Sequence, residues 1–243
     1  MIFSWLFLCL RSVSMLNLSV QDKGSFRMRS IIAFSVLTIG LLLFLFLNQS
    51  NVSANDAGKT TLSPWPPVVG ETYPDLELID QMGNPFRLSA LKGKVILLEP
   101  VGMTCPACQA FSGAHDTGPF GGGVAGRGLN SVHKLLPKYS NGFKIPHRDV
   151  VLVPALLYDM RMGAPSAKDA VAWAKHFGLK MSRNEIVAVS PYDLRSKIAY
   201  NLIPGFQLID RNFVLRSDSS GHHPKNNLYT HLFPLVPKLV KSR

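Results

Sequence analysis

The feature that most limits how this chain can fold is an apolar strand that leads directly into a pair of cysteines. Residues 95–101 read VILLEPV, and Cys105-Pro106-Ala107-Cys108 follows three residues later. An almost unbroken apolar run of this length is typical of a central strand that is buried on both faces. The residues after the second cysteine, QAFSGAH, can form a helix. The sequence therefore predicts a strand, a Cys-x-x-Cys junction and a helix in immediate succession.

The spacing of the two cysteines indicates redox chemistry. At a strand-to-helix junction Cys105 lies at the helix N-terminus, where free N–H groups and the helix dipole stabilise a thiolate. Two intervening residues allow a small disulfide ring, and Pro106 suits the first helical turn. A structural zinc site would need a second cysteine pair, and the only other cysteine is Cys9. We therefore predict Cys105 as the exposed attacking thiolate and Cys108 as the buried resolving thiol, with no cofactor besides their disulfide.

The rest of residues 68–243 alternates between strand and helix patterns. A hairpin with a Gly-Asn-Pro turn comes first, a second central strand is predicted at 150–158, and a helix at 166–178. Two antiparallel strands are predicted near the C-terminus. The Gly-rich stretch 113–128 has too few side chains to pack and is predicted to be a mobile surface loop. This alternation predicts the α/β class with a mixed sheet.

A second apolar run, at residues 31–47, indicates export. It reads IIAFSVLTIGLLLFLFL, and no charged residue lies between Arg29 and Asp56. At the rise of an α-helix it is about 25 Å long, close to the thickness of a bilayer core, and basic residues precede it. Val52 and Ala54 fit the small-residue pattern of a signal-peptidase site. The run is predicted either as an uncleaved anchor, which its length favours, or as a signal peptide cleaved after Ala54.

The predicted organisation follows from this run. We expect a single span of the inner membrane with the globular domain in the periplasm, or a domain secreted to the periplasm after cleavage. The first segment is cytoplasmic, or lies before the true start if translation begins at Met28. The predicted parts are 1–30 for this segment, 31–47 for the transmembrane or signal segment, 48–67 for a linker and 68–243 for the domain.

The charge of the chain does not indicate a nucleic-acid partner. The net charge is +11, and residues 55–243 hold 22 of the 26 Lys and Arg and 14 of the 15 Asp and Glu. The basic residues are scattered, without the clustering or interleaved aromatic residues of a nucleic-acid groove. A basic exported domain near an anionic membrane surface explains the charge more simply.

Two segments, VILLEPVGMTCPAC and LIPGFQLIDRNFVL, carry a resemblance to a known family. Together they resemble the thioredoxin superfamily, and within it the membrane-anchored TlpA-like and redoxin (AhpC/TSA-type) proteins. The resemblance implies a thioredoxin-like fold, with a central mixed sheet flanked by helices and Cys105 and Cys108 as the redox pair. It implies that Glu99 is a buried acid that takes the proton of the resolving thiol. It further implies that Pro204 is a cis-proline that faces the cysteines and presents backbone to the substrate.

The resemblance implies an exported thiol–disulfide oxidoreductase that works through a mixed disulfide. Its expected partners are protein thiols and disulfides, with a membrane electron donor if it acts as a reductase. The direction of the reaction stays open, because Pro-Ala between the cysteines does not fix the reduction potential.

Two alternative functions remain open from the sequence. A thiol peroxidase is one, because Pro100 and Thr104 match the start of the peroxiredoxin pattern, but that pattern would place its cysteine at 107, where this chain has Ala107. Thr104 also stands where thioredoxins carry Trp. The other is a Cu(I) metallochaperone of the Sco type, with ligands drawn from Cys105, Cys108, His222 and His223. Sco proteins have three residues between the cysteines and this chain has two, and paired histidines in a polar turn are most often only solvated.

Overall fold

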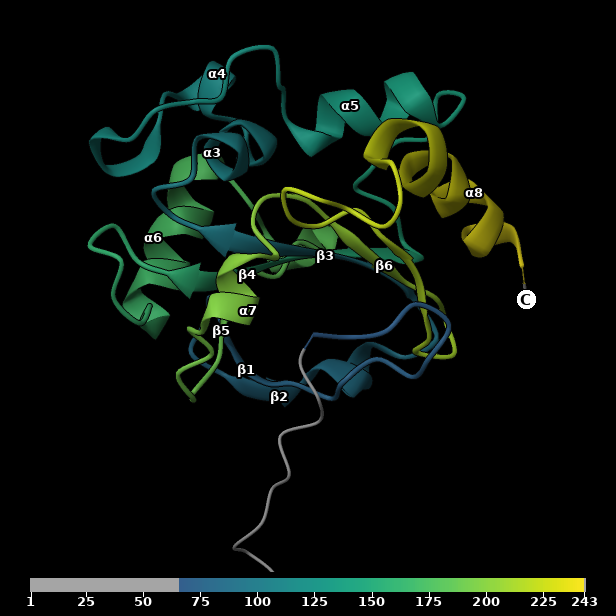
Figure 1. Cartoon of the computed structure of the whole chain (residues 1–243), viewed down its shortest axis with the longest axis horizontal. Helices are drawn as coiled ribbons and strands as arrows, with labels where there is room; N and C mark the ends of the chain where they lie inside the picture. The colour runs from purple at the N-terminus through teal and green to yellow at the C-terminus, as the bar shows by residue number, and fades with distance from the viewer. Residues whose placement is uncertain (1–65, 243) are drawn as a thin grey trace, which may run out of the picture. The chain divides into compact units, whose positions relative to one another are not determined.

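The apolar run at 95–101 forms an inner strand of a seven-stranded sheet in the computed structural model (Figure 1). The structure describes residues 66–242. The predicted membrane or signal segment 31–47, the cleavage position at Ala54 and Cys9 lie outside the described residues. Within residues 66–242 no helix has the length and hydropathy needed to cross a membrane.

The sheet is mixed, as predicted. Its order is β2-β1-β5-β4-β3-β6-β7. Strands β3, β4 and β5 run parallel, whereas β6 is antiparallel to β3, and β7 is antiparallel to β6. At the other end, β1 is antiparallel to both β5 and β2, which confirms the predicted hairpin. The strands are β1 (Glu77–Asp80), β2 (Pro85–Arg87), β3 (Val95–Gly102), β4 (Val150–Tyr158), β5 (Ala188–Val189), β6 (Gln207–Ile209) and β7 (Leu215–Asp218).

The two central strands are buried over their whole length, which explains their continuous apolar sequences. Every residue of β3 and of β4 is buried. Side chains alternate between the faces of a strand, so Val95 and Leu97 join one apolar cluster while Ile96 and Leu98 join another. The sheet therefore separates two cores.

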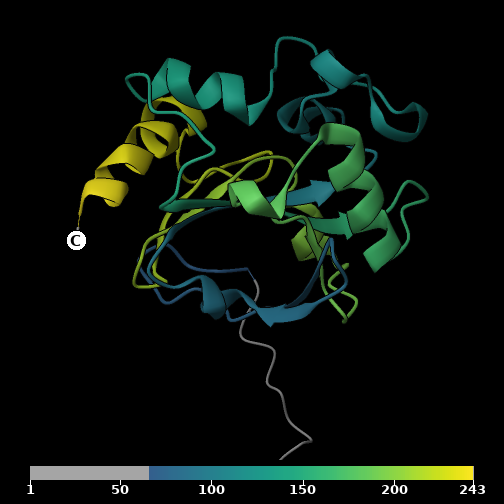
Figure 2. The ribbon, with the colours of Figure 1, turned by 180° about the vertical axis from the view of Figure 1, so that it is seen from behind.

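The longer helices pack on one face of the sheet, and the N-terminal part of the domain covers the other (Figures 1 and 2). The crossovers from β3 to β4 and from β4 to β5 step in the same direction. Because parallel crossovers are right-handed, α3 and α6 fall on the same face. The helices are α3 (Pro106–Ser112), α4 (Ala114–Thr117), α5 (Val132–Tyr139), α6 (Ala167–Phe177), α7 (Lys197–Tyr200) and α8 (Phe233–Lys241).

The ends of α6 are set by local sequence, as predicted for 166–178. The Asp169 carboxylate accepts a hydrogen bond from the backbone N–H of Ser166 at 2.7 Å, which closes the N-terminus of the helix. Gly178 ends the helix in the left-handed conformation, with φ of 66°.

The prediction that residues 113–128 are too poor in side chains to pack is wrong. The stretch forms α4 and a short 3-10 turn, Phe120–Gly122. The Phe120 ring packs against the tryptophan of α6, with 5.4 Å between ring centroids, and the buried Gln109 amide bonds to both the N–H and the carbonyl of Phe120. Gly126 donates its N–H to the Pro106 carbonyl at 2.7 Å. One aromatic anchor and close backbone contacts thus hold a glycine-rich segment against α3.

The chain before β6 touches the segment that follows β7 at backbone distance. Gly205 has φ of 133°, and a Cβ there would lie 2.2 Å from the Ser219 carbonyl oxygen. We expect Gly205→Ala to lower the free energy of unfolding by about 3 kcal/mol or more, because the two backbones must separate. Gly128 is also left-handed, but a Cβ there would meet no atom within 4 Å, so Gly128→Ala should cost only about 1–2 kcal/mol. Urea unfolding followed by tryptophan fluorescence measures both, and equal losses would contradict this account.

Candidate active site

The cysteine pair lies where β3 ends and α3 begins. Cys105 is the N-cap residue of α3, with extended backbone angles, and Pro106 occupies the first helical position. The Cys105 Sγ accepts a hydrogen bond from the backbone N–H of Cys108 at 3.4 Å. A sulfur atom therefore takes the place that a serine or aspartate oxygen takes in an ordinary helix cap.

Cys105 is the accessible thiol of the pair. Both thiols are free, and Cys105 is partly exposed while Cys108 is buried. A hydrogen bond from the Cys108 side chain lowers the pKa of Cys105 to about 7, helped by the backbone N–H groups of Cys108 and Ala107, although its partial burial acts in the opposite direction. A large fraction of Cys105 is therefore thiolate at neutral pH, and the thiolate is the reactive form.

Cys108 is held as a thiol. Burial, more than any other cause, raises its pKa well above the ordinary value, and the hydrogen bond to Cys105 and the nearby charge of Glu99 act in the same direction. Its Sγ also lies 3.9 Å from the Pro100 carbonyl oxygen. The two thiols are thus chemically different although they are three residues apart.

Glu99 is a buried acid beneath the pair. It lies in β3 with 1% of its surface exposed, and its Oε1 has no hydrogen-bond partner among the described residues. Burial raises the pKa of Glu99 well above the ordinary value, and the negative charge of Cys105 adds to this. The carboxyl therefore interacts electrostatically with both cysteines.

Pro204, the fourth residue predicted from the sequence, also lies close to the cysteine pair. The Ile203–Pro204 peptide bond is cis, in agreement with the prediction, and Pro204 lines the same cavity as Cys105. The structure thus has three features in one domain. They are the strand order β4-β3-β6-β7, the Cys-x-x-Cys at the start of the helix after β3, and the cis-proline before β6. This part of the chain has a thioredoxin-like fold.

No protein-family model matches the chain, and no curated protein matches it significantly. Several solved structures are similar to the thioredoxin-like domain. A candidate electron transfer protein of Aquifex aeolicus is 19% identical, and the match covers 72% of this chain and 100% of that protein with a TM-score of 0.48. A candidate protein disulfide isomerase of Bacteroides thetaiotaomicron is 17% identical, covering 72% and 92% with a TM-score of 0.47. A Sco-family cytochrome c oxidase assembly protein is 15% identical, covering 73% and 98% with a TM-score of 0.45.

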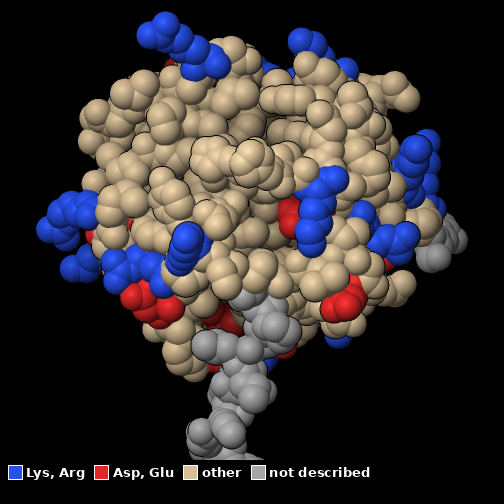
Figure 3. Space-filling view, in the orientation of Figure 1, with Lys and Arg blue, Asp and Glu red and all other residues tan. Residues whose placement is uncertain are grey.

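A cavity of about 240 Å³ opens beside Cys105. It is bounded by the CxxC turn, by the end of β4 and the turn after it, by α7 and by the loop that follows β7. Figure 3 shows the same face of the molecule as Figure 1, and residues other than Lys, Arg, Asp and Glu cover its upper middle, although some charged residues lie nearer its centre. Besides the CxxC turn, the lining residues include Tyr158, Met162, Tyr200, Ile203, Pro204 and His222.

The histidines predicted as alternative metal ligands do not gather around the thiols. His222 lines the cavity, whereas His223 is exposed and does not line it. Across residues 66–242 no group of three or more His, Cys, Asp or Glu side chains is arranged to hold a metal ion. The geometry therefore gives no support to the set Cys105, Cys108, His222 and His223.

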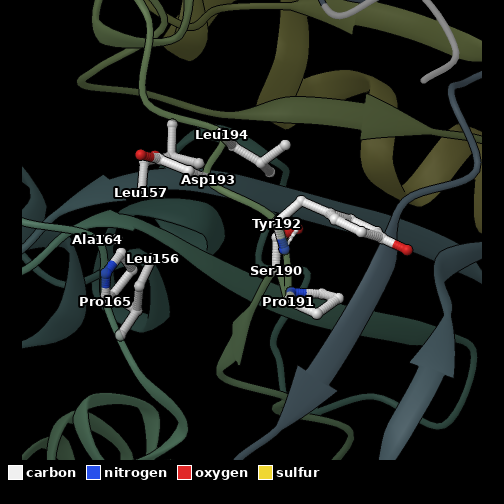
Figure 4. A pocket seen from close by; sticks show the side chains of 9 residues that line it. All are labelled: Leu156, Leu157, Ala164, Pro165, Ser190, Pro191, Tyr192, Asp193 and Leu194. Carbon is white, nitrogen blue, oxygen red and sulfur yellow. Dashed lines mark hydrogen bonds between the residues drawn. The ribbon is translucent and has the colours of Figure 1, made fainter.

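A second, smaller cavity of about 90 Å³ lies at the ends of β4 and β5 (Figure 4). Its lining includes Ser190 and Asp193 but neither a cysteine nor a histidine. It therefore contains no candidate nucleophile for redox chemistry, and the reactive group of this region is the thiol in the larger cavity.

Sequence reasoning did not identify three residues that form walls of the larger cavity. Tyr158 ends β4, Met162 lies in the turn after it and Tyr200 ends α7, so the fold brings them to Cys105 from separate segments. None belongs to a local motif, and only knowledge of the strand order could have placed them together.

The lowered pKa of Cys105 predicts its reaction with an alkylating agent. In a Cys9→Ser background, we expect the rate of Cys105 alkylation by iodoacetamide to rise with a midpoint near pH 7, against about 9 for an ordinary thiol. Cys108→Ala should move the midpoint upward, because the Cys108 hydrogen bond is the largest contribution that lowers this pKa. Peptide mass spectrometry assigns the modified cysteine, and a midpoint near 9 in the parent protein would contradict the assignment.

Proposed function

We propose that this chain is a thiol–disulfide oxidoreductase that uses Cys105 and Cys108. The observation that carries the proposal is the contrast between the two sulfurs. The pKa of the accessible Cys105 is lowered to about 7, and the pKa of the buried Cys108 is raised. An attacking thiol is most effective when its pKa lies near the ambient pH, and a resolving thiol must stay protected until the mixed disulfide has formed.

The reaction proceeds by two exchanges. The Cys105 thiolate attacks one sulfur of a substrate disulfide, forms a mixed disulfide and releases the other sulfur as a thiolate, which takes a proton from solvent. The Cys108 sulfur then attacks Cys105, and the second substrate thiolate leaves and is protonated. The substrate disulfide gains two electrons, and the 105–108 disulfide holds the oxidised state of the protein. The reverse sequence oxidises a substrate dithiol.

Glu99 serves the second exchange in this proposal. Cys108 must lose its proton to attack, and Glu99 interacts electrostatically with it. Once Cys105 is in a mixed disulfide, its negative charge is gone, and with it one of the causes that raise the pKa of Glu99. The ionised form of Glu99 is therefore easier to form at the step that needs a base, and the carboxylate accepts the Cys108 proton.

The position of Thr104 does not favour the alternative of a thiol peroxidase. Its hydroxyl donates a hydrogen bond to the Met162 Sδ at 3.2 Å. The hydroxyl is therefore engaged with a thioether on the far side of the cavity mouth. A peroxidase would predict rapid consumption of hydrogen peroxide that is lost in Cys105→Ser.

We also propose that the reaction takes place outside the cytoplasm. The support is the apolar run at 31–47 with its basic flank. In the periplasm the substrates would be protein thiols and disulfides, and a reductase would need electrons from a membrane donor, since the compartment is oxidising.

The redox equilibrium of the pair tests the proposed function. The protein is equilibrated in dithiothreitol buffers and glutathione buffers that together cover a graded series of potentials, and the free thiols of the pair are counted by mass. We expect a single two-electron transition with a midpoint between about −300 and −120 mV, the range of catalytic thiol pairs. A pair that stays in one redox state in all of the dithiothreitol and glutathione buffers would overturn the proposal.

A further inference from the structure

The cavity beside Cys105 has a composition that restricts what can bind next to the reactive sulfur. None of its lining residues is Lys, Arg, Asp or Glu, and most of the wall is aromatic or aliphatic, with Tyr158, Tyr200 and Ile203 prominent. A small charged disulfide, such as one that carries free carboxylates and ammonium groups, would find no opposite charge there. Burying such groups without a partner is unfavourable.

The volume of the cavity also restricts its occupant. At about 240 Å³ it is smaller than the cavities that enclose drug-sized ligands, which begin at roughly 300 Å³. It can accept one large side chain, while the rest of the substrate stays on the surface. An occupant of this kind must be attached to the disulfide that Cys105 attacks, because the reactive thiol is part of the same cavity.

Met162 is held in place at the mouth of this cavity. Its φ of 62° is unfavourable for a residue other than glycine. The Asp159 carboxylate maintains the turn by accepting the N–H of Gly163 at 2.6 Å, and Arg195 donates to the Met162 carbonyl at 3.1 Å. Met162 is nonetheless 46% exposed. Because its Sδ also accepts the Thr104 hydroxyl, the thioether is fixed across the cavity from Cys105 without being buried.

We propose that this cavity binds a large apolar side chain next to the reactive cysteine of a polypeptide disulfide, and that Met162 and Tyr200 determine this preference. The inference rests on the proposed function and narrows its substrate class. Both residues line the cavity, and both are about half exposed, so they are available to a substrate. A polarizable thioether and a tyrosine ring are suited to contacts with apolar side chains.

Single-turnover reduction of synthetic peptides tests the proposal. The full-length protein, reduced beforehand, reacts with symmetric peptide disulfides that differ only in the residue beside cysteine, either Leu, Gly or Asp. We expect the Leu peptide to react at least about 10-fold faster than the Gly peptide, since an apolar pocket discriminates by roughly 10–200-fold. The Asp peptide should be the slowest.

The variants separate this preference from general damage. Met162→Ala and Tyr200→Ala should each lower the Leu-to-Gly rate ratio severalfold, because each removes part of the apolar wall that the Leu side chain would contact. Met181→Ala and Tyr192→Ala are matched controls, because both residues are exposed and neither lines the cavity. The controls should leave both rates unchanged.

Two results would overturn the proposal. The first is an equal rate for the Leu and Gly peptides in the parent protein, and the second is a ratio that neither Met162→Ala nor Tyr200→Ala alters. Hydroxyethyl disulfide has no neighbouring side chain, so its reduction shows whether the substrate preference alone fails or the proposed oxidoreductase function fails as well. If it is reduced while the peptides show no preference, only the inference on substrate class fails, and if no disulfide reacts, the proposed function fails with it.

Discussion

Cys105→Ser is expected to lower the rate of insulin disulfide reduction by roughly a thousandfold or more. The variant keeps the shape of the helix start but replaces a sulfur whose pKa is about 7 with a hydroxyl that is not ionised at neutral pH. Losing the nucleophile removes the first exchange altogether, and nucleophile deletions in other enzymes have effects of this order or larger. The turbidity of precipitating insulin B chain measures the rate with dithiothreitol as the electron donor.

The matched control for this experiment is Cys9→Ser. Cys9 has no part in the proposed exchange, so its loss should leave the rate unchanged. Substantial activity in Cys105→Ser, or equal losses in the two variants, would contradict the assignment of Cys105 as the attacking thiol.

Replacing Glu99 is expected to change stability and turnover in opposite directions. Glu99→Leu removes a buried carboxyl whose Oε1 has no partner among the described residues. Relieving such a group should raise the free energy of unfolding at pH 8 by about 1–3 kcal/mol. The same change removes the proposed base for Cys108, and loss of a general base slows a step by roughly a hundredfold or more. Urea unfolding measures the first effect, and single-turnover decay of the mixed disulfide measures the second.

The pH dependence of stability provides a further check on Glu99. Because its pKa is raised in the folded state, the folded protein binds more protons than the unfolded chain above the ordinary carboxyl pKa. This carboxyl therefore destabilises the fold increasingly as the pH rises through that window, up to its folded pKa. The stability gain from Glu99→Leu should be larger at pH 8 than at pH 5. A variant that is less stable at both pH values, or that resolves the mixed disulfide at the parent rate, would contradict this role.

The central fold could be predicted because its signals are local. The unbroken apolar sequences of β3 and β4 follow from burial on both faces, and the ends of α6 follow from Ser166 and Gly178. The position of the cysteine pair at a helix start follows from the same kind of signal, since strand, turn and helix are consecutive. In each case the residues that determine the structure lie within a few positions of one another.

The Gly-rich segment shows where a prediction from composition fails. Its few side chains gave the expectation of a mobile loop, but Phe120 finds a pocket against α6 and Gln109 binds its backbone. The contact with α6 joins segments that lie before and after β4 in the sequence. Composition describes how many side chains can pack, but it does not describe where a single aromatic residue will find a partner.

The walls of the cavity could not be predicted for a related reason. Met162 and Tyr200 reach Cys105 only because β4 is the neighbour of β3 and α7 precedes the cis-proline. The left-handed conformation of Met162 has no sequence signal, since methionine is not a residue that favours it. The reactive cysteines can therefore be predicted from the sequence, whereas the residues that line the cavity can be identified only from the tertiary structure.

Trapping of the mixed disulfide tests the central claim most directly. In a Cys9→Ser background, Cys108→Ala leaves Cys105 able to attack but removes the thiol that resolves the intermediate. After reaction with a disulfide-linked peptide, intact mass spectrometry should show one peptide bound per protein, mapped to Cys105, whereas the protein that retains Cys108 should release the peptide and lose two hydrogens on forming its own disulfide. Failure of Cys108→Ala to form an adduct, or a stable adduct in the protein that retains Cys108, would contradict the division of roles between the two cysteines.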